Sequence, residues 1–176
     1  LLNETTQQQI LSMYFSDDGH KYNMARLPIG SSDFALMSFN YAPYPNDYDL
    51  DNFKLTYYDT QHIIPFIQSS LNSFTSSTYS KLTTDFMFIA SPWSAPGWMK
   101  ENNEMTCGID TCLLCKLKDD NRTKTTYAKY ISQFITEYNK AINHSIYGIT
   151  PQNEPEYCPQ FYEGMHFDPQ TEGEFI

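Results

Sequence analysis

The stretch Phe86-Met87-Phe88-Ile89-Ala90 is an uninterrupted apolar run with the length of a β-strand. Runs of this kind are typical of strands that are buried on both faces, as in parallel sheets. Weaker strand patterns cover residues 22–29 before it and residues 146–150 after it. In the first of these, Pro28 predicts an exit from regular strand pairing, because proline has no backbone N–H to donate. The sequence therefore predicts three strands.

Amphipathic helices are predicted before, between and after these strands. They cover residues 6–18, 59–74 and 125–143, and a further helix begins at residues 168–172. Pro65 in the second helix marks either a kink or the true first turn. Helices that alternate with strands are typical of a parallel α/β sheet. The links that follow the strands are long, as where an α/β barrel or an open sheet builds its site.

Composition narrows the class of protein. The chain has 176 residues, of which 40% are hydrophobic and 16% aromatic, and this excludes intrinsic disorder. Its 21 acidic residues outnumber 11 basic ones, for a net charge of −10, so nucleic acid is not expected as a partner. No apolar run approaches the roughly 18 residues that a membrane-spanning helix needs. The chain lacks an initiator Met, so we expect it to be processed or cut out of something longer.

The four cysteines leave two interpretations open. They stand at Cys107, Cys112, Cys115 and Cys158. The C-x-x-C formed by Cys112 and Cys115 suits a redox pair or half of a zinc site. The other candidate ligands, His144, Cys158 and His166, do not form a second closely spaced pair. We expect disulfides in an oxidising compartment, with free or metal-bound thiols as the alternative. Sequons at Asn3, Asn121 and Asn143 add weak support for secretion.

Polar and aromatic residues gather at or just beyond the carboxyl end of each predicted strand. They are Arg26 and Asp33 at the first, Trp93 and Trp98 at the second, and Asn153 and Glu154 at the third. Because the carboxyl ends of parallel strands meet at one edge of a sheet, these side chains are expected to converge. Sugars offer apolar faces to aromatic rings and hydroxyl groups to carboxylates and amides, so the set suits a carbohydrate. The two tryptophans are equally compatible with ordinary core packing.

Three runs of sequence carry a resemblance to a known family. Residues 26–34, 90–100 and 148–155 are together similar to glycoside hydrolase family 30, and within it to the enzymes that hydrolyse glucosylceramide. Asn153-Glu154-Pro155 resembles the acid/base signature of the wider clan, and Tyr41-Ala42 and Asp59-Thr60 extend the similarity over nearly the whole chain. The resemblance implies a (β/α)8 TIM barrel and a retaining β-glucosidase that cleaves glucosylceramide into glucose and ceramide. It implies no cofactor and no metal ion.

The resemblance also implies a role for each site residue. Glu154 would be the general acid/base, and Asn153 would hydrogen-bond the 2-hydroxyl group of the sugar. Asp33 and Trp93 would bind other hydroxyl groups of the glucosyl unit, and Arg26 would support the catalytic carboxylates. Trp98 is better interpreted as packing behind the site. The cysteine cluster at residues 107–115 departs from the family pattern, and we expect it in a peripheral loop, as a local disulfide with little bearing on the chemistry.

The retaining mechanism needs a second carboxylate, a nucleophile about 5–5.5 Å from the acid/base. In the family the acid/base follows the fourth barrel strand and the nucleophile follows the seventh. The predicted strands then correspond to barrel strands 2 to 4. Residues 1–176 are expected to form the N-terminal part of the catalytic domain, with the nucleophile beyond Ile176. This part alone is expected to be inactive.

Two other functions are compatible with the sequence. One is a related family 30 hydrolase that acts on β-glucans or xylosides. The other is a non-catalytic module that binds carbohydrate or lipid and lacks the nucleophile. For a glucosylceramide hydrolase, the resemblance implies a glycolipid substrate, peripheral contact with a membrane and help from a small activator protein. It also implies a lysosomal or secreted location.

Overall fold

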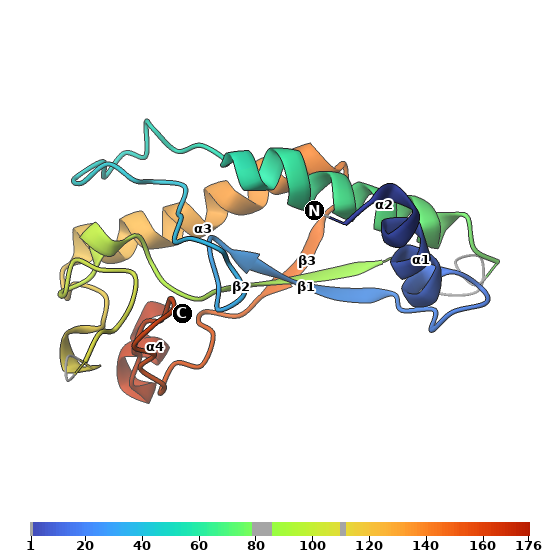
Figure 1. Ribbon diagram of the computed structural model, residues 1–176. Helices are drawn as coiled ribbons and strands as arrows, with labels where there is room; N and C mark the ends of the chain where they lie inside the picture. The colour runs from blue at the N-terminus through green and yellow to red at the C-terminus, as the bar shows by residue number, and fades with distance from the viewer. Residues whose placement is uncertain (1, 79–85, 110–111) are drawn as a thin grey trace.

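The computed structural model describes residues 2–78, 86–109 and 112–176. At its centre is a three-stranded parallel sheet in the order β1-β2-β3 (Figure 1). The strands are β1 (Met24–Ile29), β2 (Met87–Pro92) and β3 (Ile146–Ile149). Ala90 of β2 pairs with Leu27 of β1 and with Ile149 of β3. The carboxyl ends of the strands therefore lie at one edge of the sheet, which confirms the predicted parallel α/β arrangement.

The first strand differs from the prediction at Pro28, which does not end the pairing. The strand continues through Pro28, opposite Ser91, and ends at Ile29. Proline is tolerated because β1 is an edge strand of the described sheet, where one side of the backbone bonds no neighbouring strand in that sheet. The chain leaves the strand at Gly30, whose φ of +81° favours glycine. A Cβ atom there would lie 3.2 Å from the Phe39 carbonyl oxygen.

Four α-helices accompany the sheet in the described part of the chain. They are α1 (Glu4–Phe15), α2 (Ile64–Thr75), α3 (Asn121–Ile142) and α4 (Pro169–Phe175). Each predicted helix is confirmed, with shifted ends. The start of α3 lies before the predicted one because the Asp120 side chain accepts a hydrogen bond from the Thr123 backbone N–H and caps the helix. Asn143, in the left-handed conformation with φ +51°, ends it.

The second helix is entered through a π-helical turn, Asp59–Ile63. Pro65 follows in the first turn of α2, where its missing N–H would have no intrahelical partner. Of the two interpretations of Pro65, the first-turn position is therefore confirmed. None of the helices in the described ranges combines the length and the hydropathy that crossing a membrane requires.

The helices α2 and α3 lie side by side over one face of the sheet (Figure 1). Leu27 and Ile29 of β1 and Phe88 and Ala90 of β2 are buried on this face. Met24 and Arg26 alternate with the buried residues along β1, so they belong to the opposite face, where both are exposed. The sheet therefore presents Arg26 on its exposed face, near the carboxyl end of the strand.

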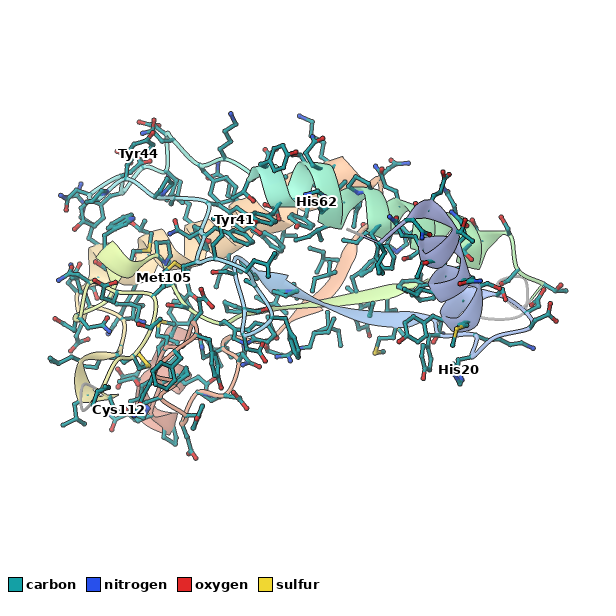
Figure 2. The ribbon with its side chains drawn as sticks, viewed as in Figure 1. His20, Tyr41, Tyr44, His62, Met105 and Cys112 are labelled. Atoms are coloured by element: carbon teal, nitrogen blue, oxygen red, sulfur yellow. A yellow bond between two sulfur atoms is a disulfide. The ribbon has the colours of Figure 1, made fainter. Side chains whose placement is uncertain are left out.

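An aromatic cluster fills the core on the helix-covered side of the sheet. Its members are Tyr41, Phe53, Tyr130, Phe134 and Tyr138. Figure 2 shows Tyr41 among the side chains gathered on this side. The ring centroids of Phe134 and Tyr138 are 4.3 Å apart, and those of Tyr41 and Phe134 are 5.5 Å apart. Such contacts add to the stabilisation that the burial of the rings provides.

The carboxylate of Asp59 is fully buried at the edge of this cluster. It accepts hydrogen bonds from the hydroxyl groups of Tyr41 (3.0 Å) and Tyr138 and from the backbone N–H of Thr56 (2.8 Å). Burial raises the pKa of the Tyr41 and Tyr138 hydroxyls, so both remain neutral donors. Asp59 therefore joins the loop after β1, the start of the π-helical turn and α3.

Candidate active site

The strand ends bring Arg26, Ser91, Thr150 and Asn153 into one hydrogen-bond network. The Arg26 guanidinium donates to the Asn153 side-chain oxygen (2.8 Å) and to the Ser91 hydroxyl (Nε–Oγ 3.1 Å, Nη2–Oγ 2.9 Å). The Ser91 and Thr150 hydroxyls also bond each other. Because the Asn153 oxygen is engaged by Arg26, the amide group presents its N–H donors to a ligand. The network takes Arg26 from β1, Ser91 from β2, and Thr150 and Asn153 from the segment after β3. Its geometry therefore depends on the order of the strands in the sheet.

Trp93 lies beside this network. The guanidinium carbon of Arg26 is 4.8 Å from the centroid of the Trp93 ring, within the range of a cation–π interaction. Trp93 is 8% exposed. Trp98, by contrast, donates its indole N–H to the Ala42 carbonyl oxygen (2.8 Å) and packs against the core, in agreement with its predicted role. The structure therefore separates the two tryptophans: Trp93 contacts the network at the strand ends and Trp98 lies behind it.

Gln152 holds the Trp93 and Asn153 segments together. Its buried side-chain amide donates to the carbonyl oxygens of Trp93 (2.7 Å) and Asn153 (2.9 Å). The sequence analysis missed Gln152, Ser91 and Thr150. The available signal was their position, since each is next to a predicted site residue or at a predicted strand end.

Glu154 is exposed at the carboxyl edge of the sheet. Its φ is +47°, in the left-handed region that residues other than glycine rarely adopt. The residue before it is held to β2 by a hydrogen bond from the Asn153 N–H to the Pro92 carbonyl (2.8 Å), and the Glu154 carbonyl accepts from the Tyr157 N–H (2.9 Å). Strained backbone of this kind clusters at functional sites, where the surroundings maintain it. Lys21 and Leu50 also have a positive φ, so this conformation describes the Glu154 backbone and its role stays a prediction.

Asp33 and Glu154 both lie within electrostatic reach of one phenol group, that of Tyr162. Partial burial raises the pKa of the Tyr162 hydroxyl, and the charge of Glu154, the neighbouring Tyr157 and the charge of Asp33 raise it further. The rings of Tyr157 and Tyr162 are neighbours, with centroids 6.4 Å apart. Sequence reasoning did not single out these two tyrosines, although both follow Glu154 in the same loop. Tyr162 is therefore a common electrostatic neighbour of the two carboxylates.

Two disulfides cross-link the loops at this edge, which confirms the expected oxidised cysteines. Cys107 bonds Cys115, and Cys112 bonds Cys158. The cysteines of the C-x-x-C motif therefore bond other partners and not each other. The expected local disulfide within residues 107–115 is confirmed by Cys107–Cys115, whereas Cys112 bonds Cys158, which follows Glu154 by four residues. Cys112–Cys158 ties the loop that carries Glu154 to the loop after β2.

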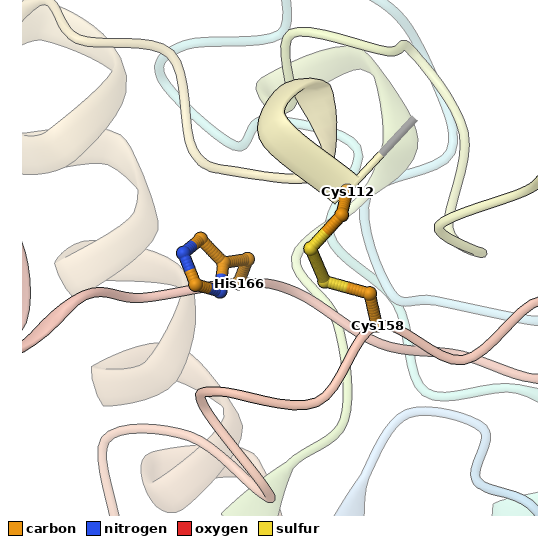
Figure 3. A group of neighbouring side chains, drawn as sticks. All are labelled: Cys112, Cys158 and His166. Carbon is orange, nitrogen blue, oxygen red and sulfur yellow. A yellow bond between two sulfur atoms is a disulfide. The ribbon is translucent and has the colours of Figure 1, made fainter. Parts of the chain in front are cut away.

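The same region contains three neighbouring residues of the types that bind zinc. The ligand atoms of Cys112, Cys158 and His166 lie within 4.8 Å of one another (Figure 3). In this structure both sulfur atoms belong to the Cys112–Cys158 disulfide, so they do not offer the thiolates that zinc binds. His166 lies beside the disulfide, and its backbone N–H donates to the Cys115 carbonyl (2.6 Å).

An apolar pocket of about 310 Å³ is lined by the sequence neighbours of Asp33, Ser32 and Phe34, but not by Asp33 itself. Its walls come from the loop after β1 and from the π-helical turn. Among the lining residues are Phe34, Leu36, Met37, Tyr58 and Ile63. Leu36 and Phe34 are 91% and 90% exposed, so the pocket opens into an apolar surface.

The chain resembles known proteins along its whole length. It matches the glycosyl hydrolase family 30 TIM-barrel domain over residues 1–176. It is 36% identical over 180 residues to "Putative glucosylceramidase 4" of Caenorhabditis elegans, an alignment that covers 100% of this chain and 32% of that protein. It is 32% identical over 178 residues to the lysosomal acid glucosylceramidase of Mus musculus, covering 99% of this chain and 32% of that protein. The chain thus spans about a third of the length of these curated relatives.

A solved structure gives the same result for the fold. The endo-β1,6-glucanase BT3312 superposes with a TM-score of 0.79 at 26% sequence identity, over 99% of this chain and 35% of that chain. The parallel sheet and its helices are consistent with the TIM-barrel domain that the sequence matches. The chain belongs to glycosyl hydrolase family 30.

Proposed function

We propose that the protein is a retaining β-glucosidase that hydrolyses glucosylceramide into glucose and ceramide. The observation that carries the proposal is the convergence of Arg26, Trp93 and Asn153 at the carboxyl ends of three adjacent parallel strands, with Glu154 next to Asn153 in the chain. Active sites of α/β barrels are built at this end of the strands. A carboxylate, an amide and an aromatic ring are the groups that bind and cleave a glycoside.

In the proposed mechanism Glu154 acts twice. It first protonates the glycosidic oxygen while a second carboxylate attacks the anomeric carbon, so the bond to the aglycone breaks and a glycosyl-enzyme ester forms. Glu154, now ionised, then takes a proton from a water molecule, which attacks the anomeric carbon and releases the sugar with retained configuration. The proposal assigns the nucleophile to a carboxylate outside residues 1–176.

The neighbours of Glu154 have supporting roles in this proposal. The Asn153 amide, oriented by Arg26, donates to the 2-hydroxyl group of the sugar, a contact that strengthens in the transition state. Asp33 accepts from other sugar hydroxyls. Trp93 offers its indole N–H and one ring face, and the guanidinium of Arg26 holds that ring.

The apolar pocket beside Asp33 favours a lipid aglycone. The hydrocarbon chains of ceramide would gain free energy by leaving water for a surface that includes Phe34, Leu36 and Met37. The likeness to the endo-β1,6-glucanase BT3312 favours a second candidate, a β-glucan substrate. A glucan would leave this apolar surface in contact with water.

A glycolipid substrate places the enzyme at a membrane surface. The proposal therefore includes peripheral membrane contact, assistance by a small activator protein and a lysosomal or secreted location. The similarity to a lysosomal glucosylceramidase and the two disulfides support such a location. At acidic pH the protonation of carboxylates would reduce the net charge of −10 and with it the repulsion from anionic lipids.

Replacing Glu154 tests the reaction. In the full-length protein, Glu154→Ala should lower kcat by about 10²–10⁴-fold for glucosylceramide, because general acid–base catalysis contributes that much. The loss should be smaller for an aryl β-glucoside whose leaving group needs no protonation, and azide should restore turnover by giving a β-glucosyl azide. Glu156→Ala, an exposed carboxylate in the same loop, is the control. Normal activity of Glu154→Ala on glucosylceramide would contradict the proposal.

A second substitution tests the aglycone. Leu36→Glu should raise the KM for glucosylceramide by roughly 10-fold or more, because the burial of a leucine side chain is worth about 1.5–3 kcal/mol. The KM for a soluble aryl β-glucoside should not change. Leu113→Glu is the matched control, since Leu113 is 81% exposed and lies outside the pocket. Hydrolysis of a β-1,6-glucan without hydrolysis of glucosylceramide would favour the second candidate.

A further inference from the structure

A buried charged cluster connects the three loops that carry Asp33, Trp93 and Glu154. Its buried members are Ser31, Lys100 and Glu163, and the exposed Ser38 bonds Glu163 as well. Lys100 is 0% exposed and Glu163 is 4% exposed. Charged side chains are rarely buried to this degree, because removing a charge from water is unfavourable unless other groups compensate. The compensating groups of this cluster come from different loops.

Glu163 binds both ends of the Asp33 loop. Its Oε1 atom accepts a hydrogen bond from the Ser31 hydroxyl (2.8 Å) and another from the Ser38 hydroxyl. The Ser31 N–H also donates to the Phe39 carbonyl (3.1 Å), which closes the loop between these residues. Glu163 belongs to the loop that carries Glu154. One carboxylate oxygen therefore links the Asp33 loop to the Glu154 loop.

Lys100 makes the corresponding connection to the loop after β2. Its Nζ donates to the Ser94 hydroxyl (3.2 Å), the Met105 carbonyl (3.1 Å) and the Gly164 carbonyl (2.6 Å). Ser94 follows Trp93, and Gly164 follows Glu163. Burial lowers the pKa of Lys100 to about 7, while the charges of Glu104 and Glu163 raise it. Below that pH the ammonium group is protonated, and its charge attracts the Glu163 carboxylate.

We propose that Glu163 is a positioning residue that, together with Lys100, fixes Asp33, Trp93 and Glu154 in the arrangement that catalysis requires. The proposal rests on the proposed function. Glu163 bonds the two serines beside Asp33, so its effect on the substrate would pass through the loops. A displacement of about 1 Å at a catalytic group is enough to reduce the rate by about 10²-fold.

The kinetic test uses the full-length protein. Glu163→Ala should lower kcat on glucosylceramide by about 100-fold, with KM changed less than about threefold. Glu163→Gln should lower it by about 10-fold, because the amide oxygen can still accept from Ser31 and Ser38. Both losses should shrink for an aryl β-glucoside with a good leaving group, because misplacement of Glu154 matters less there. The control is Glu101→Gln, an exposed carboxylate beside Lys100.

A structural role alone predicts a different pattern. Activity would then fall equally for both substrates, in proportion to the loss of folded protein, and this result would overturn the proposal. Ser38→Ala is a milder second variant, because Ser38 is exposed and its replacement removes one hydrogen bond to Glu163. Its effect on kcat should be largely absent in the Glu163→Ala background. Full additivity of the two changes would also count against the proposal.

Amide hydrogen exchange gives a readout that needs no activity. In Glu163→Ala, exchange in residues 31–39 and 158–166 should become about 10-fold faster, while exchange in α3 should not change. Unchanged exchange in both loops would overturn the positioning role even if the enzyme is a glucosidase. Conversely, wild-type activity of Glu154→Ala would overturn the proposed function, and the exchange experiment would still test whether Glu163 fixes the loops.

Discussion

Asp59 and Glu163 are both buried carboxylates that accept hydrogen bonds from hydroxyl groups, but they connect different kinds of structure. Asp59 begins a helical turn, and its partners Tyr41 and Tyr138 belong to an aromatic core. Glu163 lies in an irregular loop, and its partners are serines of another loop. Around Asp59 the burial of rings supplies most of the stabilisation. Around Glu163 the loops depend on buried charges and disulfides, which hold the site in place.

The largest expected effect is at Asp59. Asp59→Ala should lower the free energy of unfolding by about 5 kcal/mol, because the buried donors of Tyr41, Tyr138 and Thr56 all lose their acceptor. Urea denaturation followed by tyrosine and tryptophan fluorescence measures the change. Asp18→Ala, at an exposed position, should change the stability by less than about 0.5 kcal/mol. A similarly small effect at Asp59 would show that the aromatic core does not need its carboxylate.

The disulfides offer a matched pair within the loop region. Replacing Cys112 and Cys158 by serine should cost roughly 4 kcal/mol, and replacing Cys107 and Cys115 roughly 2.5 kcal/mol. The difference follows from the sequence separations of 46 and 8 residues, because a longer closed loop restricts the unfolded chain more. Urea denaturation at 25 °C measures both. If the two replacements lower the free energy of unfolding equally, or not at all, the disulfides do not stabilise the loop region as described above.

The smallest expected effect is the pH dependence that Lys100 contributes. The pKa of Lys100 is lowered from 10.5 to about 7 by burial, against the charges of Glu104 and Glu163. Between these values the unfolded chain binds a proton that the folded chain does not, so stability rises with pH. From pH 7 to pH 9 the wild type should gain about 2 kcal/mol relative to Lys100→Met, because at pH 7 the folded chain still binds about half a proton at Lys100. Lys54→Met, at an exposed position, should follow the wild type.

The pH profile also separates the two regions. Burial raises the pKa of Tyr41, Tyr130 and Tyr138, so the aromatic cluster gains no charge over this pH range. The difference between the wild type and Lys100→Met should therefore reflect the loop region alone. A flat difference from pH 7 to pH 9 would show that the Lys100 ammonium group stays protonated in the folded protein.

Much of the fold could be predicted from the sequence because it depends on local patterns. The apolar run at residues 86–90 and the helical spacing of residues 125–143 gave the correct kinds of element in the correct order. The ends were less accurate, because they depend on single contacts. The Asp120 cap moved the start of α3, and the edge position of β1 allowed Pro28 to remain in the strand.

The candidate site was predicted in part. Arg26, Trp93 and Asn153 meet as their positions at the carboxyl ends of parallel strands required, and Trp98 packs behind them. The connections between loops could not be predicted, because no local pattern relates Ser31 to Glu163 or Cys112 to Cys158. Such pairs are far apart in the sequence and meet only in the folded chain. The roles assigned to Glu154 and Asp33 stay predictions.

At Glu154 the left-handed backbone lowers the stability of the fold, whereas the side-chain carboxylate is needed for the proposed activity. A non-glycine residue held there costs about 1–3 kcal/mol, whereas glycine adopts a positive φ without a steric penalty. Glu154→Gly would then relax the backbone while removing the carboxylate. A selection for thermal stability alone would favour that change, and a selection for turnover would reject it. Glu154, whose φ is positive in this loop, is thus a residue that function, and not folding, would have to conserve.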